Sequence, residues 1–109
     1  MTAMQTALKA LAEPRRQEIL RLVFGTELSA GEIASQFDIS WPAVSQHLGV
    51  LKEADLVTER RDGKRRLYTA NEARVDEIRA FFQSFWDTRL ERLKREIETN
   101  RKDARGKRG

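Results

Sequence analysis

The chain has 109 residues, of which 39% are hydrophobic and 35% are charged, and it contains no cysteine. This composition predicts one small folded domain, and the lack of cysteine excludes disulfides, thiolate chemistry and sulfur-ligated metal sites. The first twenty residues carry charges at Lys9 and Glu13 and no long apolar run. We therefore expect neither a signal peptide nor a membrane span, and we predict a cytoplasmic protein.

The formal net charge of +4 is concentrated in two short segments. Residues 99–109 carry the whole surplus, and their few apolar residues predict a disordered basic tail after a folded body of residues 1–98. Such a tail is either a solubilising end or an arm that touches DNA without sequence preference. Within the balanced body, residues 58–66 (TERRDGKRR) hold five cations and two anions. This basic segment, rather than the overall charge, indicates a polyanionic partner.

Hydrophobic spacing predicts a mainly α fold with the order helix, helix, helix, helix, hairpin, long helix. Met4, Leu8 and Leu11 repeat at helical spacing and mark the first helix. Pro14 suits the first turn of a second helix, which continues to Gly25.

A helix-turn-helix is predicted between residues 29 and 53. Ser29 and Glu32 stand three apart, the spacing of a capping box, and begin a short third helix. After a turn at residues 38–39, Ser40 caps a fourth helix that has Pro42 in its first turn. Two short helices joined by so tight a turn form this motif.

The fourth helix pairs an apolar stripe with a nearly uncharged outer face. At about 100° per residue, Val44, Leu48 and Leu51 fall on one side, whereas Gln46 and Gly49 point the other way. A short, uncharged face suits the major groove of DNA, which supplies its own hydrogen-bonding pattern. Packing on another protein element, or exposure to water, is the alternative. The residues predicted to meet the groove are Ser40, Trp41, Pro42, Ala43, Ser45, Gln46 and His47.

These residues are expected to differ in what they do. Gln46 is the best candidate for reading a base, because its amide can pair with adenine through two hydrogen bonds. Ser45 and His47 are expected to contact phosphate or to position the helix, and structural packing is the stronger expectation for His47. Trp41 is either an apolar wedge against a thymine methyl group or a structural plug.

Beyond Leu56 the pattern alternates, and the Asp62-Gly63 pair predicts a hairpin turn. Counting outward from that turn places Arg60 opposite Arg65 and Arg61 opposite Lys64. Directly opposed like charges destabilise a hairpin, and a bound polyanion would relieve the repulsion. We interpret the hairpin as a wing that grips phosphates or a minor groove; a solvated basic loop is the alternative. The cations predicted to contact the DNA backbone are Arg15, Arg16, Lys52, Arg60, Arg61, Lys64, Arg65 and Arg66.

Asn71 can cap a last helix from Glu72 to about Asn100, roughly 40 Å long. Both terminal helices then carry an apolar face that so small a domain cannot cover, and burial in a twofold dimer is preferred to packing within one chain. The aromatic residues of the last helix could also line a ligand pocket, although such spacing more often makes a core or an interface. The predicted dimer interface is Met4, Leu8, Leu11, Val75, Ile78, Phe82, Phe85, Trp86, Leu90 and Leu93.

Catalytic constellations are lacking. His47 is the single histidine, and Ser45 lies about 200° around the same helix, so the two cannot form a nucleophile and its base. The carboxylates of the last helix are interleaved with Arg and Lys, as on a solvated face. We predict no enzyme, no cofactor and no bound metal.

Four runs of sequence resemble the ArsR/SmtB family of bacterial winged helix-turn-helix repressors: LAEPRRQEIL, ELSAGEIA, SWPAVSQHLGVLKEADLV and RRDGKRRLY. The V-S-x-H-L element from Val44 to Leu48 is the most specific of the shared features, and the resemblance covers residues 5–98. It implies a homodimer that joins through its first and last helices. It also implies binding to operator DNA near the protein's own promoter, with release by an effector.

The resemblance departs from the family pattern at three places. Metal-sensing members begin the third helix with two cysteines, and the matching positions here are Ser29 and Gly31. The alternative metal site in the last helix needs histidines, which this helix lacks. Gly49 stands where relatives often carry a cation, so backbone affinity should rest more on Arg15, Arg16, Lys52 and the wing. The chain therefore resembles members that do not sense metals.

The sequence as a whole predicts a dimeric repressor that binds an inverted repeat in double-stranded DNA and joins the bacterial nucleoid when bound. Two alternatives are a winged-helix docking module for an acidic protein and an architectural DNA binder without sequence preference. Operator, effector and regulated genes cannot be read from the residues.

Overall fold

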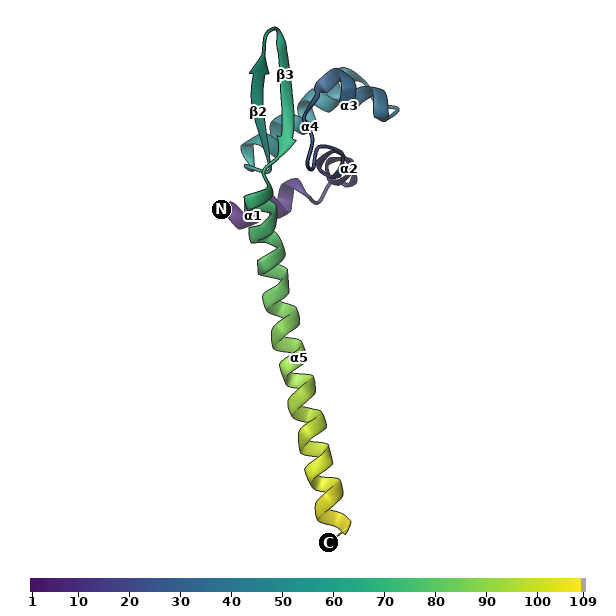
Figure 1. The fold of residues 1–109 in the computed structure, drawn as a ribbon, viewed down its shortest axis with the longest axis vertical. Coiled ribbons are helices and arrows are strands. Elements are labelled where there is room, and N and C mark those ends of the chain that lie inside the picture. Colours follow the sequence, from purple (N-terminus) through teal and green to yellow (C-terminus); the bar gives the residue numbers. More distant parts are fainter. Residues whose placement is uncertain (109) are drawn as a thin grey trace. The chain divides into compact units, whose positions relative to one another are not determined.

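The computed structural model describes the backbone of residues 1–108 and the side chains of residues 1–101 (Figure 1). Residues 1–78 form one compact unit, and a second unit begins at Arg79 and consists of the rest of the last helix. In chain order the elements are α1 (Ala3–Ala10), α2 (Pro14–Leu22), β1 (Leu28–Ser29), α3 (Ala30–Gln36), α4 (Trp41–Glu53), β2 (Val57–Asp62), β3 (Arg65–Ala70) and α5 (Glu72–Arg108).

The predicted helix starts of the helix-turn-helix are confirmed. The Ser29 Oγ accepts a hydrogen bond from the Glu32 backbone N–H at 3.2 Å, and the Glu32 carboxylate accepts one from the Ser29 N–H at 3.0 Å. The Ser40 Oγ caps α4 by accepting from the Ala43 N–H at 3.3 Å. Each cap satisfies a backbone donor that the first helical turn leaves without a partner.

The hairpin forms, but its predicted register is wrong by two residues. In the structure Asp62 faces Arg65, Arg61 faces Arg66 and Arg60 faces Leu67. The turn residues are Gly63 and Lys64, with φ of 63° at Gly63 and no positive φ at Lys64. A turn with glycine at its first central position needs positive φ only there, so Asp62 is free to pair in the strand. One like-charge pair therefore faces across the tip instead of two.

The sequence analysis did not predict the strand β1. Its two residues pair antiparallel with β3, Leu28 opposite Tyr68 and Ser29 opposite Leu67, which gives a three-stranded sheet of order β1-β3-β2. Two residues are too short to show an alternating pattern, so only the fold reveals the strand. It joins the middle of β3 to the segment that leads into α3.

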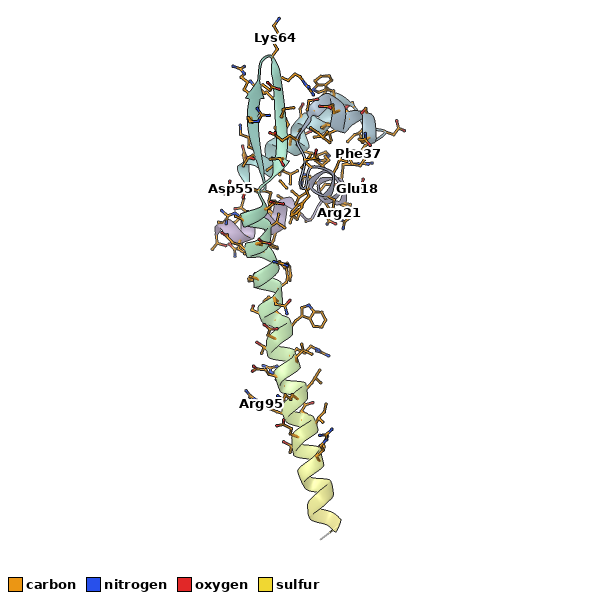
Figure 2. The ribbon with its side chains drawn as sticks, viewed as in Figure 1. Glu18, Arg21, Phe37, Asp55, Lys64 and Arg95 are labelled. Atoms are coloured by element: carbon orange, nitrogen blue, oxygen red, sulfur yellow. The ribbon has the colours of Figure 1, made fainter. Side chains whose placement is uncertain are left out.

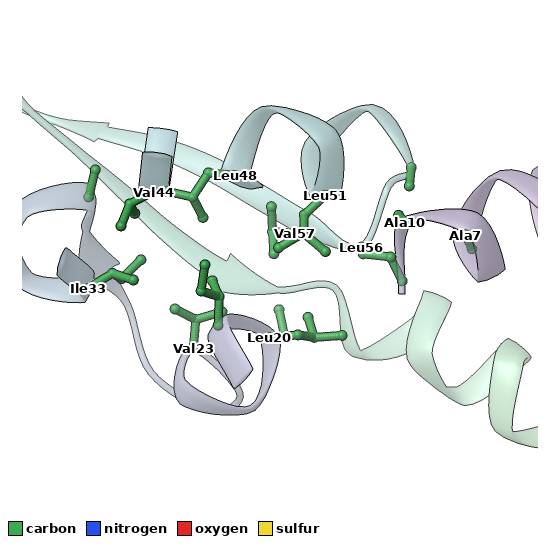
Figure 3. Packing of buried hydrophobic residues seen from close by; sticks show 14 of the residues in the cluster. Ala7, Ala10, Leu20, Val23, Ile33, Val44, Leu48, Leu51, Leu56 and Val57 are labelled. Carbon is green, nitrogen blue, oxygen red and sulfur yellow. The ribbon is translucent and has the colours of Figure 1, made fainter. Parts of the chain in front are cut away.

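The apolar core fixes the orientation of α4 (Figure 3). Val44, Leu48 and Leu51 are at most 1% exposed, which confirms the predicted stripe. They pack in one cluster with Ile33 of α3 and Val57 of β2. Since burying such a side chain contributes about 1.5–3 kcal/mol, the opposite face of α4 is held outward by the core.

The last helix is longer than expected. The sequence predicted its end near Asn100, but α5 runs to Arg108. Residues 99–105 contain no proline or glycine to stop it, and Gly106 alone is a weak breaker. The backbone of residues 99–108 is part of α5, while the side chains of 102–109 lie outside the described residues. The division into a body of residues 1–98 and a basic tail stays a prediction. No helix in the described chain is long and apolar enough to cross a membrane.

Candidate nucleic-acid interface

The outer face of α4 is open and carries no charge along its middle. Ser45, Gln46 and Gly49 are exposed, and so are Ser40 and Pro42 at the start of the helix. The side-chain amide of Gln46 makes no hydrogen bond within the described chain, so its donors and acceptor are available to a ligand. Ala43 is half-buried, at the edge of the face.

Trp41 sits on α3. A Cβ placed on Gly31 would lie 3.0 Å from the Cζ3 atom of the Trp41 ring, so the absence of a side chain at Gly31 makes room for the indole. The ring is nevertheless 61% exposed. Part of the ring therefore has a packing role against α3, and a contact between the exposed part and a thymine methyl group stays a prediction.

His47 is half-buried and faces an arginine of α2. An Arg16 Nη1 lies 3.5 Å from the His47 Nδ1. The Arg16 Nε also donates to the carbonyl oxygen of Ala10, at the end of α1. Arg16 therefore joins the end of α1 to α4. This geometry agrees with a positioning role for His47, and it engages part of the guanidinium that was predicted to contact DNA.

Most of the predicted wing cations already hold carboxylates. Arg60 donates from Nε and Nη2 to the two oxygens of Glu27, at 2.9 and 3.0 Å. Arg65 pairs with Glu32, the residue that also caps α3. These carboxylates come from the segment around β1. The sequence analysis did not predict their pairing with the wing, because 33 residues separate each of them from its arginine.

Two further predicted cations share one carboxylate. Lys52 Nζ lies 2.9 Å from Glu59, and Arg66 Nε lies 3.6 Å from the same side chain. Among the described side chains, Arg61 and Lys64 have no carboxylate within ion-pair distance. Lys64 lies at the tip of the hairpin (Figure 2).

Arg15 of α2 is also engaged. It pairs with Glu18 at 3.0 Å, and its guanidinium carbon lies 5.3 Å from the centre of the Phe37 ring. Such a stacked arginine is held in place by a cation–π contact. Of the eight cations predicted to bind the DNA backbone, five therefore have acidic partners.

The pKa values of the carboxylates reflect these contacts. The hydrogen bond from Arg60 lowers the pKa of Glu27. The Ser29 N–H, and then Arg65, lower the pKa of Glu32. Lys52 lowers the pKa of Glu59. All three are consequently ionised at neutral pH, so the pairs are ion pairs there.

An open cleft of about 440 Å³ joins α4 to the hairpin. It brings Trp41 and Ser45, from the predicted groove set, together with Lys64, Arg65 and Arg66 from the predicted wing set. The cleft is completed by Ser29, Ala30 and Tyr68. The sequence analysis did not place these three residues at the interface, although it expected Ser29 as a helix cap.

The predicted dimer residues divide by exposure. Met4, Leu8, Leu11 and Val75 are half-buried, and Ile78 is only 7% exposed and belongs to the core, where it packs beneath the surface. The residues from 82 onward are open: Phe82 (48%), Phe85 (59%), Trp86 (60%), Leu90 (57%) and Leu93 (41%), to which the structure adds Ile97 (53%).

The aromatic residues of α5 contact one another. Phe81 packs edge-on against Phe82 and Phe85, with ring centres 5.5 and 5.0 Å apart. Within the described chain no group of three or more potential metal-ligating His, Asp or Glu side chains comes together.

Comparison with known proteins places this fold. The family model described as "Bacterial regulatory protein, arsR family" matches residues 13–59, which run from the cap of α2 into β2. The chain is 40% identical over 68 residues to the transcriptional repressor SdpR of Bacillus subtilis, an alignment that covers 62% of this chain and 76% of the relative. The chain belongs to the ArsR family.

Two more relatives extend the comparison. This ArsR-family chain is 39% identical over 75 residues to the arsenical resistance operon repressor of Staphylococcus aureus, covering 69% of this chain and 72% of the relative. It also resembles a solved homodimeric winged helix-turn-helix DNA-binding domain from Mycobacterium bovis, a possible ArsR-family transcriptional regulator. That match has a TM-score of 0.65 and 32% identity, and covers 78% of this chain and 79% of the other.

The resemblance and the winged helix-turn-helix fold predicted from the sequence are thereby confirmed. In this ArsR-family protein the two positions that carry cysteines in metal-sensing members have structural tasks. Ser29 caps α3, and Gly31 leaves room for the Trp41 ring.

Proposed function

We propose that this ArsR-family protein is a homodimeric transcriptional repressor that binds an inverted repeat in double-stranded DNA. The observation that carries the proposal is the arrangement of α4, whose apolar stripe is buried to 1% exposure or less while Gln46 and Ser45 stand open on the opposite side. Next to that open face lies a cationic hairpin, joined to it by the cleft that Trp41 and Lys64 line.

In this function α4 enters the major groove. Gln46 pairs with adenine, because its free amide offers one donor and one acceptor in the spacing of the adenine edge. Ser45 and the exposed edge of Trp41 lie beside it and meet the neighbouring backbone and base edges. The distance between the first turn of α4 and the DNA is set by Ser40, Pro42 and Ala43.

The backbone contacts come from the cations around this face. Arg61 and Lys64 are ready to meet phosphates because neither pairs with a carboxylate among the described side chains. The paired cations contribute after exchanging their carboxylate for a phosphate, as charge-assisted bonds to either anion are of similar kind. Arg15, Lys52, Arg60, Arg65 and Arg66 are in this second group. Arg16, which holds the Ala10 carbonyl oxygen instead of a carboxylate, contributes through the donors that this bond leaves open.

Dimerisation is supported by the open apolar face of α5. Phe85, Trp86 and Leu90 are each more than half exposed, which is costly for a helix in water and unusual unless a partner covers it. The homodimeric relative from Mycobacterium bovis supports a second copy as that partner. Twofold symmetry then sets two α4 helices about 34 Å apart and gives the DNA site its inverted repeat.

Regulation is proposed to follow the repressors that the chain resembles, with an effector that releases DNA but without cysteine-bound metal. Self-regulation at its own promoter is part of the same proposal. Like the family of regulators to which it belongs, the protein is proposed to work in the cytoplasm and to have no catalytic activity.

The experiment that tests this function titrates the purified protein against its own upstream DNA and against random duplex, each at two salt concentrations. A repressor binds the upstream DNA about 10³-fold or more tightly than random duplex. A docking module for an acidic protein would bind neither duplex, and an architectural binder would show the salt dependence without the preference.

A further inference from the structure

Two glutamates on one side of the hairpin hold one arginine on each of its strands. Glu27 lies just before β1 and pairs with Arg60 of β2, and Glu32 lies in the first turn of α3 and pairs with Arg65 of β3. The hairpin segment 58–66 has a net charge of +3 by itself. These two carboxylates lower the local charge to +1.

We propose that Glu27 and Glu32 restrain sequence-independent DNA binding by holding Arg60 and Arg65 until a phosphate displaces them. The inference rests on the proposed DNA-binding function and adds to it a pair of residues that set affinity without touching DNA. Their effect is to lower the affinity of the wing for duplexes of any sequence.

The geometry makes each pair a competitor for phosphate. Glu27 occupies the Nε and Nη2 donors of Arg60 together, which is the edge that a phosphate would also use. A phosphate contact with that edge therefore requires the carboxylate to leave. Part of the electrostatic gain on binding DNA is then offset by the ion pair that is lost.

The pairs are also loose enough to exchange. The side chains of Arg60 and Glu27 are 57% and 38% exposed, and those of Arg65 and Glu32 are 56% and 46% exposed. Pairs so open to water are weak, so a phosphate can replace the carboxylate without unfolding the wing. The pairing of β1 with β3 keeps Leu28 opposite Tyr68 and so holds the carboxylates beside the hairpin.

Charge-removing variants test the restraint. Glu27→Gln and Glu32→Gln are compared with the natural protein for binding to a random duplex between 50 and 200 mM salt. Glutamine at residue 32 can still accept from the Ser29 N–H, so the cap of α3 is kept while the charge is lost. Each variant should bind about three- to tenfold more tightly at the lowest salt and should steepen the slope of log K against log salt by about 0.9.

A matched variant separates this effect from a general change of charge. Glu77→Gln alters the net charge equally but removes a partner of Arg74 on α5, and it should leave the slope unchanged. In an Arg60→Gln background, Glu27→Gln should have no further effect, because its arginine is gone. Circular dichroism and thermal unfolding confirm that every variant is folded.

The outcomes are distinct. If the natural protein does not bind duplex DNA at all, the proposed function fails. If it binds, but Glu27→Gln and Glu32→Gln behave like Glu77→Gln, only the restraint is overturned. The restraint also fails if Glu27→Gln tightens binding equally with and without Arg60.

Discussion

The outer face of α4 and the hairpin would use opposite means to meet the same duplex. The face of α4 has little charge, and its position depends on side chains buried in the core, such as Val44 and Leu48. The hairpin has many charges, and their availability depends on exposed ion pairs such as Arg60 with Glu27. The position of the α4 face therefore depends on packing and little on salt, whereas the charges of the hairpin depend on salt and little on packing. Specificity and affinity can therefore be altered separately in this fold.

The largest effect should come from removing the support of α4. Leu48→Ala deletes a side chain that is 1% exposed at the centre of the buried stripe. The lost burial and the remaining cavity should lower the free energy of unfolding by about 2–5 kcal/mol. Urea unfolding measures it, and a loss below about 1 kcal/mol would mean that the core does not hold α4 as tightly as its burial indicates.

The next effect isolates base reading from support. Gln46→Ala should weaken binding to the preferred site by about 1–3 kcal/mol and leave binding to random duplex unchanged. Stability should stay the same, because Gln46 is exposed and makes no bond within the described chain. Fluorescence anisotropy on both duplexes measures the difference, and an equal loss on both would show that Gln46 reads no base.

The core-facing features were predictable because they depend on local signals. The capping box of α3, the serine cap and first-turn proline of α4 and the buried stripe follow from residues within one or two turns of each other. The register of the hairpin could not be predicted in the same way. Asp62-Gly63 and Gly63-Lys64 can each form a two-residue turn, and the pairing of the strands decides between them.

The acidic partners of Arg60 and Arg65 could not be predicted from the sequence for a different reason. Glu27 and Glu32 meet Arg60 and Arg65 because β1 pairs with β3, which is far from it in the sequence, and β1 is too short to leave a pattern. The expectation of two repelling pairs at the tip was wrong because of the register, which leaves Arg61 opposite Arg66 as one such pair. Two of the hairpin arginines, Arg60 and Arg65, are paired with acids from another segment.

A smaller effect distinguishes free cations from paired ones. Arg61→Gln removes a cation that has no carboxylate partner in the described part of the chain, and it should reduce the slope of log K against log salt by about 0.9 on random duplex. Arg60→Gln removes a paired cation and should change that slope less. Binding titrations at four salt concentrations compare the two variants, which have the same charge and lie side by side in β2. Equal slopes would remove the distinction between free and paired arginines.

The smallest effect is the dependence of stability on pH. The folded protein lowers the pKa of the Glu27 carboxyl, through Arg60, and that of Glu32, through the Ser29 N–H and Arg65, below the ordinary 4.5. A lowered pKa means that the pairs contribute stability above pH 4.5 and that this contribution is lost as pH falls through the folded-state values. Between pH 5 and 8 these two groups should leave stability unchanged.

Urea unfolding from pH 3 to 7 measures the effect. As the pH falls, the free energy of unfolding should decrease less in the Glu27→Gln, Glu32→Gln double variant than in the natural protein. Because the pairs are exposed the difference should be small, and high salt should shrink it further, whereas the loss caused by Leu48→Ala should persist at every pH and salt concentration.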